Sequence, residues 1–469
     1  MDLHIPFDNS YARLPEQLFA RQEPTPVRAP RLVAFNHALA SQLGLAGIDD
    51  DTTLAEVFSG SRLPDGAEPL AQLYAGHQFG HWNPQLGDGR AVLLGEVNGL
   101  DLQLKGAGRT PFSRRGDGRA WLGPVLREYV VSEAMFALGI PTTRALAAVE
   151  TGEDIMRDGL QPGAVLTRVA ASHIRVGTFQ ALAARQDIAG LRALFEHAVE
   201  RHYPDVTTPT EFLDSVIKKQ AELIAAWMSV GFIHGVMNTD NCAISGETID
   251  YGPCAFMDAY HPMTVFSSID RQGRYAYGNQ PDIIVWNLAQ LATALVPLMP
   301  NADQAVAEFT NSVHAMPGLL NAAWQQRFGA KIGLTAVTDG DMALITEYLS
   351  LMAEQGTDFT NSFRALNNGT ARDQFVDRDA FDAWNTRWRT RLESETQDPV
   401  ATMNAANPAL IPRNHRIEEM IAAAVNGDYR PFDRLMRALS TPFTDPRDDA
   451  DLTRPPSESE RVHATFCGT

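Results

Sequence analysis

The stretch from 232 to 252 holds the densest group of side chains in this chain that could do chemistry. His234, Asp240 and Asn241 lie in a polar loop, and Asp250 follows within an Ile-Asp-Tyr-Gly-Pro run. Carboxylate and amide oxygens are the ligands that Mg²⁺ prefers, together with phosphate oxygens and water. Taken alone, these residues fit a metal site and a set of Asx turns equally well.

Regular elements must hold this loop in place. Residues 211–230 have the apolar period of a long helix, which Gly231 ends. After the loop, the short apolar piece Cys242–Ser245 and a Gly-Glu turn lead to Asp250. Loops that carry this many metal-capable oxygens between short strands are commonly functional sites.

A second candidate feature is a glycine-rich turn followed by a hairpin. Gly87, Gly89 and Arg90 lie in the turn, and residues 91–97 and 100–105 have the pattern of strands. The Asn-Gly pair between the two segments predicts a type I′ hairpin turn. The turn and the returning strand together could form a cradle for phosphate.

Lys105 ends the second strand of this hairpin on the polar side of its alternation. Glu128 follows 23 residues later on an expected helix over 121–138, and a buried Lys–Glu pair would orient the ammonium at a phosphate. The simpler interpretation makes Lys105 a solvated charge at a sheet edge and Glu128 part of a solvated helix face.

Residues 106–119 contain four glycines and four arginines, and they repeat the Gly-Asp-Gly-Arg of 87–90 at 116–119. Glycine lets the backbone approach an anion closely, and arginine can form two hydrogen bonds to phosphate oxygens. Arg168 and Arg175 follow near the end of another expected strand. The repeat favours anion binding over a disordered basic loop.

Two histidines, His77 and His81, are four residues apart and could share a helix face to bind metal. They are flanked by Gly76, Gly80 and Trp82 and have no carboxylate nearby. This context favours a structural role.

The composition is that of an ordinary globular protein of two lobes or two to three domains, with 469 residues, 44% apolar and 20% charged. A net charge of −18 argues against nucleic acid or an anionic membrane as a partner, since both need a basic surface. The uncharged run 283–302 contains Asn, Gln and Pro and predicts a buried amphipathic helix rather than a membrane span.

Three cysteines are too few for a disulfide framework, and the N-terminus has no signal-peptide pattern. We therefore expect a cytoplasmic protein. Nothing in the sequence suggests a dedicated assembly interface, so we expect a monomer.

We expect an α+β fold whose parts follow one another along the chain. They are an N-terminal extension that packs on the body (1–70, with a helix over 32–44), a β-rich lobe (71–175), a mostly helical lobe (176–440) and a C-terminal tail (441–469). The order of glycine turn, hairpin, strand lysine, helix glutamate, His…Asn loop and Asp-x-Gly resembles that of a bilobed protein kinase. Seven residues separate His234 from Asn241, as in kinases, but Val236 stands where kinases have their catalytic aspartate.

Longer motifs carry a closer resemblance. They are Gly-Asp-Gly-Arg (87–90), Leu-Lys-Gly-Ala-Gly-Arg-Thr-Pro-Phe-Ser-Arg-Arg-Gly-Asp-Gly-Arg (104–119), Gly-Ile-Pro-Thr-Thr-Arg-Ala-Leu (139–146), His-Gly-Val-Met-Asn-Thr-Asp-Asn (234–241) and Ile-Asp-Tyr-Gly-Pro (249–253). With Asn-Pro-Ala-Leu (407–410) and a cysteine third from the C-terminus, they extend from about Leu73 to the last residues. In these motifs the chain resembles the selenoprotein O family.

The resemblance implies a pseudokinase fold that binds ATP in a flipped orientation, with the γ-phosphate buried. It implies transfer of AMP to Ser, Thr or Tyr hydroxyls of proteins, with release of pyrophosphate. By position it implies nucleotide contacts for Gly87, Gly89, Arg90, Asp117 and Gly118, phosphate binding for Lys105, Arg168 and Arg175, an ion-pair partner of Lys105 in Glu128, the proton acceptor in Asp240, and metal ligands in Asn241 and Asp250. Mg²⁺ and Mn²⁺ both accept such oxygen ligands.

Two other functions stay open on the sequence. A conventional phosphotransferase would use Asp240 as the base and move the γ-phosphate, and a nucleotide-binding scaffold would catalyse nothing. Val236 argues against the first, and the intact Lys105, Asp240 and Asp250 argue against the second.

The resemblance also implies a redox-active residue at Cys467. Because Cys254 is the only cysteine between Asp250 and the tail, a free thiol at Cys467 is as good an interpretation as a regulatory disulfide.

Overall fold

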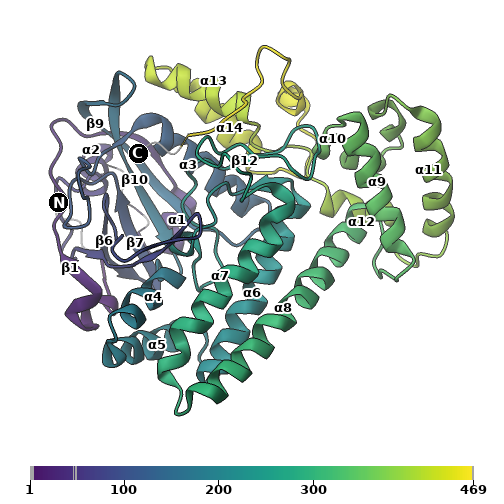
Figure 1. Ribbon diagram of the computed structural model, residues 1–469. Coiled ribbons are helices and arrows are strands. Elements are labelled where there is room, and N and C mark those ends of the chain that lie inside the picture. Colours follow the sequence, from purple (N-terminus) through teal and green to yellow (C-terminus); the bar gives the residue numbers. More distant parts are fainter. Residues whose placement is uncertain (1–4, 46, 48–49, 467–469) are drawn as a thin grey trace.

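The computed structural model describes residues 5–45, 47 and 50–466. They form a large antiparallel sheet on the N-terminal side and a mainly helical C-terminal part (Figure 1). The expected α+β class is confirmed.

The main sheet has the spatial order β1-β3-β6-β7-β10-β9-β2, and β8 pairs with β10. Its strands are β1 (Phe19–Arg21), β2 (Arg31–Phe35), β3 (Leu70–Gln72), β6 (Ala91–Val97), β7 (Leu100–Lys105), β8 (Ala120–Trp121), β9 (Arg144–Met156) and β10 (Leu160–Ala170). The predicted β6–β7 hairpin is confirmed, because both turn residues have positive φ, 51° at Asn98 and 76° at Gly99.

Two small two-stranded sheets lie outside it. One pairs β4 (Gly76–Gln78) with β5 (His81–Asn83), and the other pairs β11 (Phe232–Ile233) with β12 (Ala255–Phe256). His77 pairs with Trp82 and His81 pairs with Gln78 in this hairpin, so the two histidines do not share a helix face.

Some of the helices pack on the main sheet, and the others build the C-terminal part. They are α1 (His37–Gln42), α2 (Asp51–Phe58), α3 (Leu122–Ala137), α4 (Val176–Ala184), α5 (Ile188–His202), α6 (Pro209–Ser229), α7 (Gln280–Leu295), α8 (Ala302–Lys331), α9 (Asp341–Gln355), α10 (Phe359–Leu366), α11 (Arg378–Leu392), α12 (Pro399–Ala406), α13 (Asn414–Val425) and α14 (Arg430–Leu439).

Strand β7 shows how the sheet is buried on both faces. Its leucines join an apolar core with side chains of α1 and α2, as their alternation predicted. Asp101, Gln103 and Lys105 on the opposite face are buried as well. The interpretation of Lys105 as a solvated edge charge is therefore wrong, and the polar face of β7 forms an internal wall.

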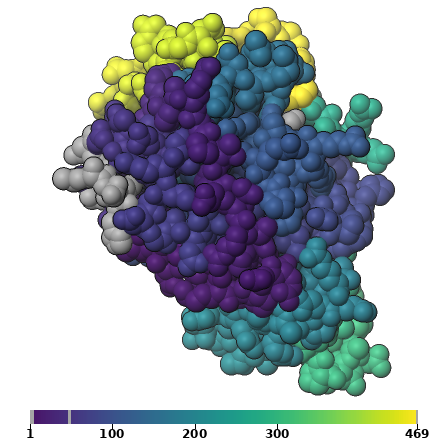
Figure 2. All heavy atoms as spheres, turned by 90° about the vertical axis from the view of Figure 1, so that its left-hand side faces the viewer, coloured from purple at the N-terminus to yellow at the C-terminus, as the bar shows by residue number. Residues whose placement is uncertain are grey.

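The first 70 residues are more closely integrated than an extension packed on the body. β1 and β2 are the two ends of the main sheet. The helix expected over 32–44 is wrong in its first part, because Arg31–Phe35 pairs with β9 and only α1 is helical. Asn36 ends the strand and caps α1, since its Oδ1 accepts from the Leu39 N–H at 3.0 Å. Figure 2 shows this purple segment crossing one face of the molecule from the yellow C-terminal segments to the teal helices.

Helix α7 is the one predicted from the uncharged run 283–302. It packs against α4, α6 and α8. With its flanking turns (Tyr277–Leu298) it is long and apolar enough by composition to cross a membrane, and half of that segment is buried inside the fold. Its packing is that of the buried helix expected from the sequence.

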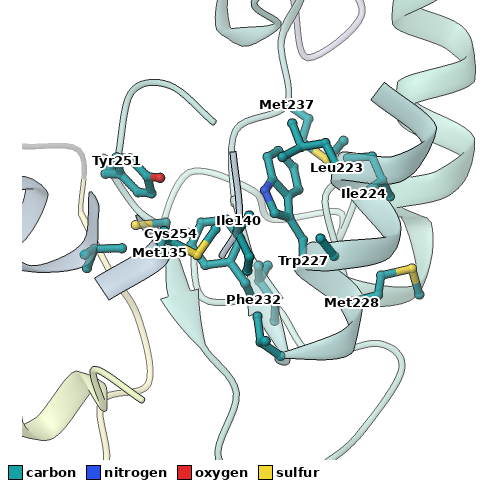
Figure 3. Close-up of a cluster of buried hydrophobic side chains, with 14 of the residues drawn as sticks. Met135, Ile140, Leu223, Ile224, Trp227, Met228, Phe232, Met237, Tyr251 and Cys254 are labelled. Carbon is teal, nitrogen blue, oxygen red and sulfur yellow. The ribbon is translucent and has the colours of Figure 1, made fainter. Parts of the chain in front are cut away.

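An apolar cluster lies beneath the polar loop (Figure 3). Trp227 of α6, Phe232 of β11 and Met237 belong to it, together with Tyr251 and Cys254. The Trp227 indole donates to Thr248 Oγ1 at 2.8 Å, which ties the helix to the far end of the loop. Cys254 is fully buried, and burial raises the pKa of its thiol to about 12. Cys467 lies outside the described residues.

Candidate active site

The paired strands β11 and β12 hold the two ends of the polar loop together. His234 follows β11, is fully buried and stacks on Trp227 with ring centroids 5.3 Å apart. Its Nε2 lies 2.8 Å from the carbonyl oxygen of Ile249, just before Asp250. Burial lowers the pKa of His234, which favours the neutral ring. Its contact with Ile249 holds Asp250 close to the Asp240–Asn241 turn.

A cavity of about 550 Å³ opens between the polar face of the sheet and this loop. Eleven of the twelve site residues predicted from the sequence line it: Gly87, Gly89, Arg90, Lys105, Asp117, Gly118, Arg168, Arg175, Asp240, Asn241 and Asp250. The twelfth, Glu128, lies behind Lys105. The tertiary structure therefore gathers residues that are up to 163 positions apart in sequence around one cavity.

The predicted ion pair between sheet and helix is present. Lys105 Nζ lies 2.5 Å from Glu128 Oε2 and 3.1 Å from Asp250 Oδ1. Arg168 joins both carboxylates, with Nη1 2.6 Å from Asp250 Oδ1 and 3.4 Å from Glu128 Oε1. Burial alone would raise the pKa of Asp250, but Arg168, Lys105 and Arg175 lower it well below its usual value. Asp250 is therefore ionised. Its ion pairs with Lys105, Arg168 and Arg175 hold its backbone at a φ of 62°.

Arg175 is a cation at the N-terminal end of a helix, where the helix dipole disfavours positive charge. It caps α4, is 1% exposed and lies 3.4 Å from both Asp88 Oδ1 and Asp250 Oδ2. Its guanidinium also stacks over the Tyr74 ring at 4.2 Å. Two carboxylates and an aromatic face thus hold a buried guanidinium at the wall of the cavity.

Asp240 lies in a short 3₁₀ turn, η3 (Thr239–Asn241), and is almost fully buried. Its Oδ2 accepts a hydrogen bond from Gln78 Nε2 at 3.2 Å, while its Oδ1 has no hydrogen-bond partner among the described residues. Burial raises the pKa of Asp240 to about 6, although its own backbone N–H, Arg175 and Gln78 act in the opposite direction. A carboxylate that titrates close to neutral pH suits proton transfer.

The glycine turn and the arginine-rich loop fold onto each other. At Gly87, whose φ is 94°, an added Cβ would lie 2.5 Å from the Phe112 ring. Thr110 Oγ1 donates to the Asp88 carbonyl at 2.6 Å, and Ser113 Oγ donates to the carbonyl of Gly89. The loop over 106–119 is therefore ordered, and the alternative of a disordered basic loop is wrong.

The two copies of Gly-Asp-Gly-Arg have different environments. Asp88 is buried and accepts from Gln103 Nε2 at 3.0 Å as well as from Arg175. Asp117 is half-exposed and pairs with both terminal nitrogens of Arg157, at 2.8 and 2.9 Å. The first copy is part of the inner wall, and the second forms the rim.

The cavity is cationic although the chain carries a net charge of −18. Seven of its lining residues are Arg or Lys, against four aspartates. A concave cationic surface concentrates field lines and attracts anions. Its size and charge suit a nucleoside triphosphate.

Comparison with known proteins places the chain among relatives of its full length. The family model described as "Protein adenylyltransferase SelO" matches residues 2–440. The chain is 65% identical to the protein nucleotidyltransferase YdiU of Ruegeria sp. (strain TM1040), over 100% of both chains. It is 64% and 63% identical to the proteins of the same name from Ruegeria pomeroyi and Roseobacter denitrificans, again over 100% of each.

The chain belongs to the SelO family of protein adenylyltransferases. The family resemblance expected from the sequence motifs is confirmed, and with it membership of a family of enzymes.

Within this family site, two residues fit the coordination of a metal ion. Asn241 Nδ2 donates to the Val236 carbonyl at 2.9 Å, which leaves its Oδ1 as the free acceptor of the amide. Asp250 is ionised and lines the same cavity. Within the described part of the chain, no group of three or more His, Cys, Asp or Glu side chains is placed so that it could hold a metal ion. A magnesium ion held here would therefore take its other ligands from phosphate and water.

Sequence reasoning missed several residues of the site. Gln78, Tyr74, Asp88, Phe112 and Arg157 all line the cavity. For Asp88 a signal existed, because it belongs to the first Gly-Asp-Gly-Arg copy. For Gln78 and Tyr74 the glycine-flanked polar stretch was visible, but its hairpin geometry was not.

Proposed function

We propose that this protein transfers AMP from ATP to Ser, Thr or Tyr hydroxyl groups of other proteins and releases pyrophosphate. The observation that carries the proposal is the cluster of Lys105, Arg168 and Arg175 around Asp250, in the cavity that Asp240 also lines. A phosphate group buried there would need several cations. A conventional kinase leaves its γ-phosphate open to attack and needs fewer.

In this proposal ATP binds in a flipped orientation, so that its β- and γ-phosphates contact Lys105, Arg168 and Arg175 and its α-phosphate faces Asp240. The protein hydroxyl gives its proton to Asp240 and forms a bond to the α-phosphorus, and the bond from that phosphorus to the bridging oxygen of pyrophosphate breaks. Lys105, Arg168 and Arg175 stabilise the charge that develops on pyrophosphate. The supporting fold is a bilobed, kinase-like one, with the sheet and the helical part as its two lobes.

Asn241 and Asp250 would hold Mg²⁺, or Mn²⁺, on the phosphates. The ion would supply further neutralisation of phosphate charge. Removal of divalent metal with a chelator should abolish AMP transfer, and added Mg²⁺ or Mn²⁺ should restore it in the wild type but not in Asp250→Ala. Transfer that continues in Asp250→Ala at the wild-type rate would show that Asp250 is not a ligand.

The decisive experiment is a parallel incubation with α-labelled and γ-labelled ATP and a protein acceptor. We expect protein-bound label from α-labelled ATP alone, and its loss in Asp240→Ala. The matched control is Asp214→Ala, which removes an exposed aspartate of α6. Label from γ-labelled ATP alone would indicate a conventional phosphotransferase, and binding of ATP without any label would indicate a scaffold.

A further inference from the structure

The β4–β5 hairpin lies directly on the loop that carries Asp240. Three consecutive residues of the hairpin hydrogen-bond to three consecutive residues of the loop. The bonds are Phe79 N to Asn238 Oδ1 (3.1 Å), His77 N to Thr239 Oγ1 (2.8 Å) and Gln78 Nε2 to Asp240 Oδ2 (3.2 Å). The first two use the hairpin backbone, so only Gln78 makes its contact through a side chain.

Neighbouring elements hold both ends of this contact between the hairpin and the loop. Gln180 of α4 bridges it, with its amide 3.0 Å from His77 Nδ1 and accepting from Thr239 Oγ1 at 2.7 Å. Tyr275 donates to Asn238 Oδ1 at 2.6 Å. Gln78 is therefore presented to Asp240 from a rigid support.

The two oxygens of Asp240 differ because of Gln78. Oδ2 carries the hydrogen bond from the Gln78 amide, whereas Oδ1 is buried without a partner among the described residues. Gly76 leaves the space for this arrangement, since a Cβ there would lie 3.1 Å from Oδ1. A buried carboxylate oxygen without a hydrogen-bond partner costs the folded protein free energy. Such an atom is therefore a candidate to accept a hydrogen bond from a bound substrate.

We propose that Gln78 is a positioning residue for AMP transfer. Its amide fixes the rotamer of Asp240 by occupying Oδ2 and leaves Oδ1 as the atom that accepts the proton of the target hydroxyl. This inference rests on the AMP-transfer function proposed above. A reacting group held in one orientation avoids the loss that follows from even a small misplacement.

The test is Gln78→Met, which keeps the length of the side chain and removes its hydrogen-bonding amide. We expect kcat for α-label transfer to fall roughly 10- to 100-fold, with the Kd for ATP within about twofold of wild type. The matched control is Gln85→Met, the same change at an exposed residue seven positions away. It should leave kcat, Kd and melting temperature unchanged.

A double-mutant cycle separates positioning from general damage. Because Gln78 acts through Asp240, adding Gln78→Met to Asp240→Ala should cause no further loss of the residual transfer. An unchanged kcat in Gln78→Met, an equal loss in both backgrounds, or a loss that appears only as weaker ATP binding would each overturn the proposal.

Gln78→Glu keeps the test decisive if Gln78→Met melts early. It preserves the shape of the side chain and places a second carboxyl group against Asp240 Oδ2, so we expect transfer at or below the level of Gln78→Met. Wild-type transfer in Gln78→Glu would count against a positioning role. Absence of α-label transfer by the wild type would instead overturn the proposed function, so the two failures are distinguishable.

Discussion

At the scale of single residues, the site depends on side chains whose geometry matters as much as their charge. Arg175 contacts Asp88, Asp250 and Tyr74 at once. A planar guanidinium can satisfy two carboxylates and stack on a ring together, whereas an ammonium is a point charge. The position therefore selects arginine for its shape.

Arg175→Lys should weaken ATP binding by about tenfold or more although the charge is conserved, because a lysine cannot keep the contacts that hold it at the cavity wall. Isothermal titration with ATP and Mg²⁺ measures the effect. Arg185→Lys, at the opposite end of α4 and exposed, is the control and should bind as the wild type does. Equal affinity in the two variants would show that charge alone is required at 175.

At the scale of elements, the site is assembled where β4, η3 and the N-terminus of α4 meet. These elements come from residues 76–78, 239–241 and 176–184, and their backbones approach closely. At Gly177 a Cβ would lie 2.2 Å from the Ala75 carbonyl oxygen, and at Gly76 it would lie 2.8 Å from Thr239 Oγ1. Glycine at both positions lets three elements share one small space.

Gly76→Ala should push the hairpin off the loop, because Thr239 Oγ1 is bonded to both His77 and Gln180 and cannot yield without losing a hydrogen bond. We expect a loss of transfer of about tenfold or more and a destabilisation of about 1–3 kcal/mol. Thermal melting and α-label transfer measure the two effects.

The control for this change is Gly318→Ala in α8, where the added methyl group meets no atom within 4 Å. That variant should gain up to about 1 kcal/mol from helix propensity. Gly76→Ala with wild-type melting and turnover would show that the hairpin adapts and that its close contact with the loop is dispensable.

At the scale of the whole molecule, an ion pair from α3 and a hydrogen bond to the main sheet join these elements to the C-terminal segments. Arg127 of α3, beside Glu128, pairs with Glu418 of α13, and Arg31 of β2 pairs with Glu150, which also accepts from Tyr429. The yellow segments above the sheet in Figure 1 thus pack on the helix that carries Glu128. The N- and C-terminal parts stabilise the sheet together.

The stability of the helical part should carry a distinct pH dependence from Lys331. This lysine is 1% exposed, lies 3.0 Å from Asn407 Oδ1 and has no ion pair within the described residues. Burial lowers its pKa from 10.5 to about 7. Between these two values the unfolded chain binds a proton that the folded protein does not, so this group makes stability rise as pH rises.

Lys331→Met removes this dependence while filling the space beside Phe363. Its melting temperature relative to wild type should therefore be highest near pH 6.5 and should fall toward about pH 9.5, because the wild type gains stability over that range. Differential scanning fluorimetry at several pH values measures the difference, with Lys218→Met on the exposed face of α6 as control. A difference that is constant with pH would contradict the effect of burial on Lys331.

The sequence by itself determined the features that depend on neighbours along the chain. Asn98-Gly99 predicted the β6–β7 turn, the apolar period predicted α6, and the alternation in β7 assigned its leucines and Lys105 to opposite faces. The long motifs identified the family, and the resemblance they carry pointed to eleven residues that line one cavity. These signals are local, because turn geometry and side-chain period are set by the backbone of a few consecutive residues.

Only the tertiary structure decided which polar groups are buried and what they contact. It turned the polar face of β7 into an internal wall, made Arg31–Phe35 an edge strand instead of a helix, and brought Gln78 to Asp240 across 162 positions of sequence. The cost of burying a charge or an amide depends on partners from distant elements, and a local pattern contains no information about those partners.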